Sequence, residues 1–213
     1  MRKIPLNTIT NTECNQVYAN RDRIALPNGI DKNTQICAGS RLGERDACRG
    51  FSGAPLLNTK EKKSCLYEIY GLNSISLVCG SGYPSVYTRV SAFLDWIENI
   101  VWLNGTEKVP EIPITHPPTT KSPKADRTFV KKCNEYHNSL FGPNRIEQNV
   151  CTFAVSPYIV DGEVAEAKEF PHMFYWQALI GFDGKNKIAW ACGGTLISEN
   201  FVLTAGHCLN VTG

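Results

Sequence analysis

The sequence lacks a long apolar run, a large excess of charge and a signal-like start. Its apolar runs fall well short of the roughly 20 residues that a transmembrane helix needs, so we expect no membrane anchor. Its net charge is only +2 at pH 7, which gives no reason to expect nucleic acid or an anionic membrane as a partner. The basic start Met1–Asn7 is followed by no continuous apolar stretch of the kind that a secretory signal contains.

The chain also lacks any pair of cysteines spaced C-x-x-C, although it contains nine cysteines. A metal site would require closer Cys and His spacing, so we expect no metal and no cofactor. Nine cysteines are hard to place in a reducing cytosol, and they indicate disulfides in a secreted, extracellular protein. Because a disulfide protein needs a route out of the cell, the missing signal predicts a fragment of a longer secreted chain.

The apolar content and turn chemistry predict a folded all-β protein. Apolar residues make up 42% of the 213 residues, an ordinary value for a globular chain. Up to residue 90, short apolar runs alternate with turn sequences such as Pro27-Asn28-Gly29, which is typical of a β-sandwich or barrel. Strand-like runs resume at 173–182, 188–197 and 201–204. The fold class that we expect is therefore all-β.

One amphipathic helix and one linker interrupt this pattern. Apolar residues at 93, 97, 100 and 101 have helical spacing, with Ser91 as the expected N-cap and Asn104-Gly105 as the stop. Residues 104–128 are rich in Pro and Thr, with too few apolar groups to offset the entropy of ordering, so we expect a disordered linker. Residues 129–158 form a segment bounded by Cys133 and Cys151.

Three motifs carry the chemistry of the chain. The first, Asp46–Pro55, reads DACRGFSGAP and contains a Gly-x-Ser-Gly turn around Ser52. The second, Ile159–Gly162, reads IVDG, and the third, Leu203–Cys208, reads LTAGHC around His207. A serine hydroxyl needs a base to remove its proton and backbone N–H donors to stabilise the oxyanion that it creates. Together with Cys37-Ala38-Gly39 and Pro84–Val90, these motifs resemble the trypsin-like serine proteases. The IVDG motif with Glu169–Met173 resembles the mature start of the insect clip-domain proteases of the snake-like and easter-like branch.

The resemblance implies a role for each motif residue. Ser52 would be the nucleophile, with the N–H groups of Gly50 and Ser52 as the oxyanion hole, and His207 would be the general base. The family places a charge at the base of its specificity pocket at Asp46, which would select Arg or Lys in a substrate. Ser76 and Ser85 stand at pocket positions that are usually Gly in the family, and would narrow that pocket.

Other family positions concern activation and disulfides. Cleavage between Tyr158 and Ile159 would free the amino group of a zymogen-type start, although the family usually has Arg or Lys before it. Phe51 stands where the family has the Asp that pairs with this amino group, so an arriving ammonium would lack its countercharge. The resemblance pairs Cys14 with Cys37, Cys48 with Cys79, and Cys192 with Cys208, and leaves Cys65, Cys133 and Cys151 as an odd set.

The order of the motifs predicts an incomplete architecture. In the family the start precedes His, Asp and Ser, whereas here Ser52 precedes both Ile159 and His207. Residues 1–103 would then be the C-terminal half of one double-barrel domain and 159–213 the N-terminal part of a second. We therefore expect Ser52 and His207 to lie in different domain copies. The segment that carries the catalytic Asp is missing, and loss of this group costs on the order of 10⁴ in rate.

Two functions remain open at this point. The first is a serine endopeptidase of an extracellular cascade, acting on protein substrates or other cascade proteases after Arg or Lys, with this chain a nearly inert piece of it. The second is a non-catalytic homologue that binds partners in such a cascade, of which Phe51 would be the mark. A sequence artefact joining two neighbouring genes is a further alternative.

Overall fold

The computed structural model describes residues 2–19, 25–40, 51–59, 67–78, 81–103, 163–164, 177–183 and 188–209, with 128, 131, 132 and 135. The chain divides into two compact units, Met1–Val90 with Cys151–Gly213, and Ser91–Val150. The described part is mostly antiparallel β-sheet with short helices, so the all-β prediction is confirmed. No helix among the described residues has both the length and the apolar character to cross a membrane.

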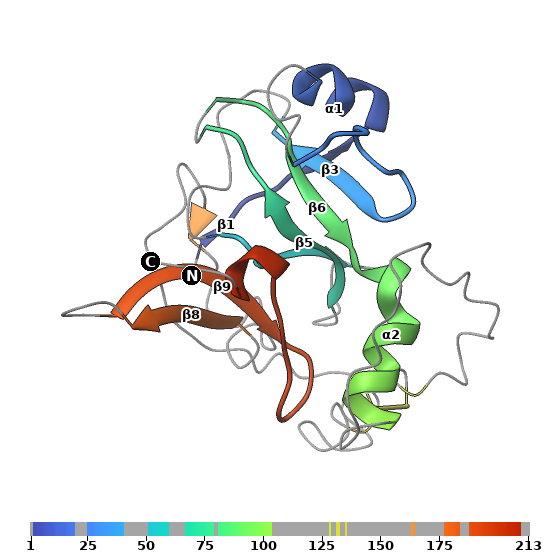
Figure 1. Cartoon of the computed structure of the whole chain (residues 1–213), viewed down its shortest axis with the longest axis vertical. Helices are drawn as coiled ribbons and strands as arrows, with labels where there is room; N and C mark the ends of the chain where they lie inside the picture. Colours follow the sequence, from blue (N-terminus) through green and yellow to red (C-terminus); the bar gives the residue numbers. More distant parts are fainter. Residues whose placement is uncertain are drawn as a thin grey trace. The chain divides into compact units, whose positions relative to one another are not determined.

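The larger sheet of the first unit contains five antiparallel strands in the order β2-β3-β6-β5-β4, and it curls as Figure 1 shows. Strand β6 pairs with β3 on one side and with β5 on the other, and the register between β5 and β6 shifts between Asn73 and Ile75. Such a bulge adds a residue to one strand and bends it. The strands are β2 Asn7–Ile9, β3 Gln35–Gly39, β4 Pro55–Thr59, β5 Tyr67–Ile75 and β6 Ser85–Arg89.

Helix α1, Asn11–Tyr18, covers part of this sheet and was not expected from the sequence. Thr10 and Glu13 form a capping box, in which the Thr10 hydroxyl accepts from the Glu13 N–H and the Glu13 carboxylate accepts from the Thr10 N–H. This box satisfies two N–H groups that a helix start would otherwise leave without partners. Cys14 and Tyr18, one turn apart, enter the core together with Leu26, Ile30, Cys37 and Val86.

The smaller sheet of the same unit has three antiparallel strands in the order β10-β9-β8. They are β8 Gln177–Asp183, β9 Ile188–Leu196 and β10 Val202–Leu203, which agrees with the strands expected at 188–197 and 201–204. A short strand β1, Arg2–Lys3, pairs antiparallel with β7, Glu163–Val164. The segment that follows the Ile159–Gly162 motif is therefore paired with the beginning of the chain.

The second unit contains the predicted helix, but its start differs from the prediction. A 3-10 turn η1, Val90–Phe93, leads into α2, Leu94–Glu98, and a π-helical turn η2, Asn99–Leu103, follows. Ser91 was expected as the N-cap, but it lies inside η1, and the N-cap of α2 is Phe93, whose side chain makes no capping bond. The tighter 3-10 turn extends the helical backbone N-terminally past Ser91.

The boundaries expected at 103, 128 and 158 stay predictions, and residues 104–127 lie outside the described part.

Candidate active site

The serine predicted as nucleophile lies on a tight turn that leads into β4. The turn is closed by a hydrogen bond from the Ala54 N–H to the Phe51 carbonyl, 2.7 Å long. Gly53 has a φ of 83°, in the left-handed region that favours glycine. The Gly53 N–H donates to the Asn73 carbonyl (2.7 Å), and the Asn73 N–H donates to the Ala54 carbonyl (2.9 Å). Strand β5 therefore holds the Ser52 turn by two backbone bonds.

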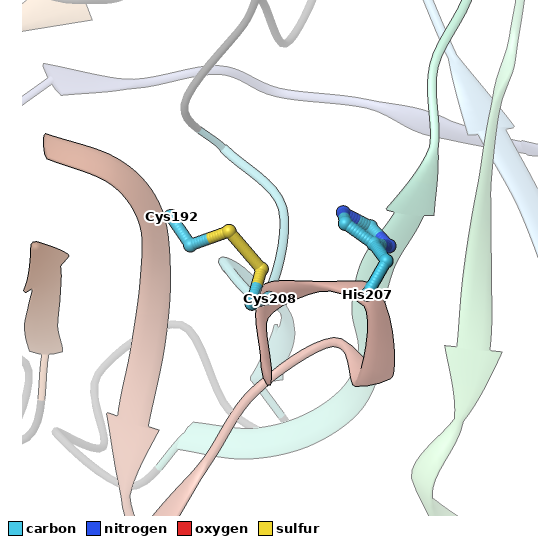
Figure 2. A group of neighbouring side chains, drawn as sticks. All are labelled: Cys192, His207 and Cys208. Carbon is cyan, nitrogen blue, oxygen red and sulfur yellow. A yellow bond between two sulfur atoms is a disulfide. The ribbon is translucent and has the colours of Figure 1, made fainter. Parts of the chain in front are cut away.

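The histidine predicted as general base lies on a 3-10 turn η4, Gly206–Leu209, after strand β10. A disulfide joins Cys192 of β9 to Cys208 of this turn. Figure 2 shows this bond, with the Cys208 and His207 side chains leaving the same short turn. The Thr204 hydroxyl donates to the Gly193 carbonyl at 2.7 Å, which ties the residues before the turn to β9 as well. His207 is exposed to solvent.

The Ser52 turn packs directly against the strand and turn that position His207. The Gly193 N–H donates to the Ser52 carbonyl at 2.8 Å, and the Cys208 Sγ lies 3.9 Å from the same oxygen. A Cβ on Gly53 would overlap the Gly193 carbonyl oxygen and lie 2.5 Å from the Thr204 Oγ1. Gly53 is therefore needed both for its φ and for the close approach of the two segments.

The motifs of Ser52 and His207, which were expected to come from different domain copies, pack together within one compact unit. The physical reason is that backbone hydrogen bonds and a close glycine contact can join segments that are far apart in sequence. Whether the two segments derive from two domain copies stays a prediction. Among the described residues no hydrogen bond joins the Ser52 hydroxyl to the His207 ring, although such bonds are often long before substrate binds.

Ser76 and Ser85, two of the three predicted pocket residues, are joined by a hydrogen bond. Ser76, just after β5, donates from its Oγ to the Ser85 Oγ at 2.9 Å. The Asn73 Nδ2 donates to the Ser76 Oγ at 3.2 Å. We call Asn73, Ser76 and Ser85 the polar triad. Asn73 is 3% exposed and Ser85 2% exposed, so most of the triad is buried.

A group of potential metal ligands also gathers at this site. The ligand atoms of Cys192, His207 and Cys208 all lie within 4.8 Å of one another. The two sulfur atoms are bonded to each other, so neither is a thiolate, the form in which cysteine binds a metal. Of the three, only the His207 ring is an ordinary metal ligand, and a single imidazole is not a metal site.

The disulfide predictions are confirmed for two pairs, Cys14–Cys37 and Cys192–Cys208. Several other predicted residues lie outside the described part of the chain, so their roles stay predictions. They are Asp46, Cys48, Gly50, Cys79, Tyr158 and Ile159, with the odd set Cys65, Cys133 and Cys151.

Two residues that connect the two motifs, Asn73 and Thr204, were not expected from the sequence. Asn73 holds the Ser52 turn and belongs to the polar triad, and Thr204 fixes the residues before His207. A polar residue at position 73 in an otherwise strand-like run was the available signal, because a buried amide needs partners. No sequence pattern around Thr204 predicted its hydrogen bond to the Gly193 carbonyl.

Comparison with known families agrees with this geometry. Residues 1–97 and 159–212, more than half of the chain, match the family profile described as Trypsin. The chain belongs to the trypsin family. Both matched segments of this trypsin-family chain contribute to the contact at Ser52, one through the serine turn and the other through β9 and η4.

Curated relatives support the expected branch of the trypsin family. The chain is 36% identical over 103 residues to Serine protease snk of Drosophila melanogaster, covering 48% of this chain and 23% of that protein. It is 43% identical over 102 residues to Melanization protease 1 of the same species (46% and 24%). For CLIP domain-containing serine protease HP8 of Bombyx mori the identity is 41% over 97 residues (45% and 24%). The chain thus spans about a quarter of the length of these relatives.

Proposed function

We propose that this chain carries the nucleophile and the general base of a serine endopeptidase, with Ser52 and His207 in these roles. The observation that supports the proposal most is the backbone bond from Gly193 to Ser52, because it places the serine turn beside the strand that is disulfide-bonded to the histidine turn. Trypsin-family membership supports the same reaction class. The Ser52 and Gly50 N–H groups would stabilise the oxyanion.

The finer parts of the proposal concern substrate and setting. Asp46, six residues before Ser52, would attract Arg or Lys in a protein substrate. Two relatives are named Melanization protease 1 and CLIP domain-containing serine protease HP8, and these names support a role in a cascade of protein substrates and other proteases. Two disulfides among the described residues favour an oxidising, extracellular compartment. Cleavage between Tyr158 and Ile159 would be the activating step.

A non-catalytic homologue is the second candidate function, and Phe51 is the observation that favours it. Phe51 is half-buried at the start of the Ser52 turn, and its carbonyl closes that turn. Its side chain has no carboxylate, so it offers no countercharge to an amino group. A protein of this kind would bind cascade partners through its surface without cleaving them.

An active-site phosphonate probe tests the first proposal. Labelling should occur on Ser52, should disappear in Ser52→Ala, and should fall at least about a hundredfold in His207→Ala, because the serine then has no base. Ser81 is an exposed serine between β5 and β6. Ser81→Ala is therefore the matched control and should leave the labelling rate unchanged.

The same assay separates the two candidate functions. If the wild-type chain is not labelled but Phe51→Asp is, the chemistry is present and Phe51 suppresses it, which favours the non-catalytic homologue. If neither chain is labelled and both remain folded by circular dichroism, the proposal that Ser52 is a nucleophile is wrong.

A further inference from the structure

Cys192, His207 and Cys208 form a group whose chemistry is only partly explained by a disulfide and a catalytic base. Their ligand atoms all lie within 4.8 Å of one another, and Figure 2 shows the His207 ring beside the disulfide over η4. In a tetrahedral zinc site, with Zn–S bonds of about 2.3 Å and Zn–N bonds of about 2.0 Å, neighbouring ligand atoms lie about 3.5–3.8 Å apart. The three residues are therefore close to the spacing of a metal site, which the bond between the two sulfur atoms keeps closed.

Reduction of this disulfide would supply the two missing ligands. A dithiol reductant gives two electrons and two protons to the S–S bond, which breaks into two thiols while the reductant closes its own disulfide. A divalent ion then displaces the two thiol protons and binds the two thiolate sulfurs. The Cα atoms of Cys192 and Cys208 are 6.1 Å apart, so both side chains reach one shared ion while β9 and η4 keep their places.

The burial of the two sulfur atoms favours zinc as this ion. Cys208 is 0% exposed and Cys192 3% exposed, and two thiolates at such positions are costly without a countercharge. Zn²⁺ balances both negative charges, and thiolate together with imidazole is a donor set that suits zinc. His207 is exposed to solvent, which gives the ion a path of entry and leaves a position for water. Among the described residues no fourth Cys, His, Asp or Glu joins the group.

We propose that Cys192, His207 and Cys208 form a zinc site that opens when their disulfide is reduced, with water as the fourth ligand. The ion bridges β9 and η4 as the disulfide does in the oxidised chain, and so restores the cross-link that reduction removes. It also occupies the lone pair of the His207 ring, which then cannot take a proton from Ser52. This last consequence rests on the proposed function, whereas the metal site itself does not.

Binding of Co²⁺, a spectroscopic substitute for Zn²⁺, tests the site. The reduced chain should show the visible bands of tetrahedral cobalt and the ultraviolet thiolate-to-cobalt band, and Zn²⁺ should abolish both. His207→Ala should weaken this binding about a hundredfold or more, since even loss of a group that supports a ligand costs about 10- to 100-fold. His172→Ala, at one of the other histidines, is the matched control and should leave binding unchanged. Equal binding by the oxidised and reduced chains, or by His207→Ala and the reduced wild type, overturns the proposal.

The chain has other thiols that bind metal ions once reduced, so the second readout is specific for His207. In the reduced wild-type chain the NMR resonances of the His207 ring nitrogens should shift when Zn²⁺ is added, and in the oxidised chain they should not. Hydrogen exchange of the same reduced sample should show that the β8 and β9 amides regain protection with Zn²⁺. Neither readout requires a cysteine substitution that could unfold the small sheet. A His207 ring that stays unshifted while Zn²⁺ binds the reduced chain overturns the proposal.

The phosphonate probe separates the metal site from the proposed function. Zn²⁺ should lower the labelling of Ser52 in the reduced chain about a hundredfold, as His207→Ala does, and a chelator should restore it. If Zn²⁺ shifts the His207 ring but leaves labelling unchanged, His207 is not the base and the proposed function is wrong, while the metal site stands. If labelling falls without a shift of the ring, the ion acts elsewhere and the metal site is wrong. If no chain is labelled, the Co²⁺ and NMR readouts still decide the metal site.

Discussion

The five-stranded sheet that positions Ser52 and the three-stranded sheet that positions His207 differ in how their apolar side chains are covered. The first has helix α1 and six core residues, among them Tyr18, which is 1% exposed. Among the residues that the structure describes, the core of the second contains three, Cys192, Ala205 and Cys208. On it, Trp190 is 58% exposed and Ile188 49% exposed. One sheet is stabilised by its own core, whereas the other depends more on its disulfide and on its contact with the Ser52 turn.

Removing the disulfide of the weaker sheet should give the largest effect. Cys192→Ala/Cys208→Ala opens a loop of 16 residues, which costs about 3 kcal/mol by chain entropy, and the small core there offers little compensation. Hydrogen exchange should show β8 and β9 amides losing protection while β3 and β6 amides keep theirs. Equal loss in both sheets would show that the two sheets unfold as one body.

Gly53→Ala should break the contact between the two regions. The new methyl group overlaps the Gly193 carbonyl, and φ is 83°, so we expect a destabilisation of about 2–3 kcal/mol. Gly206→Ala is the matched control, because an added Cβ there meets nothing within 4 Å. Urea unfolding should separate the two variants by at least about 1.5 kcal/mol, and similar midpoints would contradict the packing described here.

Tyr18→Phe tests the stronger sheet. The buried Tyr18 hydroxyl donates to the Pro84 carbonyl at 2.7 Å, and its removal leaves that carbonyl without this donor, at a cost of about 1–2 kcal/mol. Tyr70→Phe, at a position 43% exposed, should change the free energy of unfolding by less than about 0.5 kcal/mol. If Tyr18→Phe lowered hydrogen-exchange protection only in β8 and β9, the difference proposed between the two sheets would be wrong.

Thr10→Ala should have the smallest effect. It removes the N-cap of α1, which contributes about 1 kcal/mol. Thr12→Ala places the same change inside the helix, where Ala is the better helix former, and should be neutral or stabilising. Circular dichroism during thermal unfolding measures both, and a Thr12→Ala chain less stable than Thr10→Ala would contradict the capping box.

The sequence predicted the parts of the fold that local patterns encode. Strand β9 is a largely apolar run that contains the Cys-Gly-Gly sequence, and its predicted range 188–197 differs from the observed one by a single residue. Helix α1 was not predicted because its apolar residues form only a weakly amphipathic pattern, although the Thr10-x-x-Glu13 spacing is a capping-box signature. The start of α2 was placed wrongly because a 3-10 turn leaves no distinct mark in the sequence.

The candidate site was predictable residue by residue but not as an assembly. Short local motifs gave Ser52 and His207 as candidates, and the family resemblance gave the cysteine pairs. The contact between Gly193 and Ser52 joins residues that are 141 positions apart, and the two hydroxyls of the polar triad come from the residue just after β5 and from the first residue of β6. Long-range backbone hydrogen bonds depend on tertiary packing, which a motif does not encode.

The pairing of β1 with β7 adds a consequence for the integrity of the molecule. Arg2 lies opposite Val164, and the bond from Gly193 to Ser52 joins the same two stretches of polypeptide a second time. Neither contact relies on the peptide backbone that connects residue 103 to residue 163. A cut in that connection would yield two polypeptides that can stay associated as a nicked complex, and the serine and the histidine would then belong to different polypeptides of that complex.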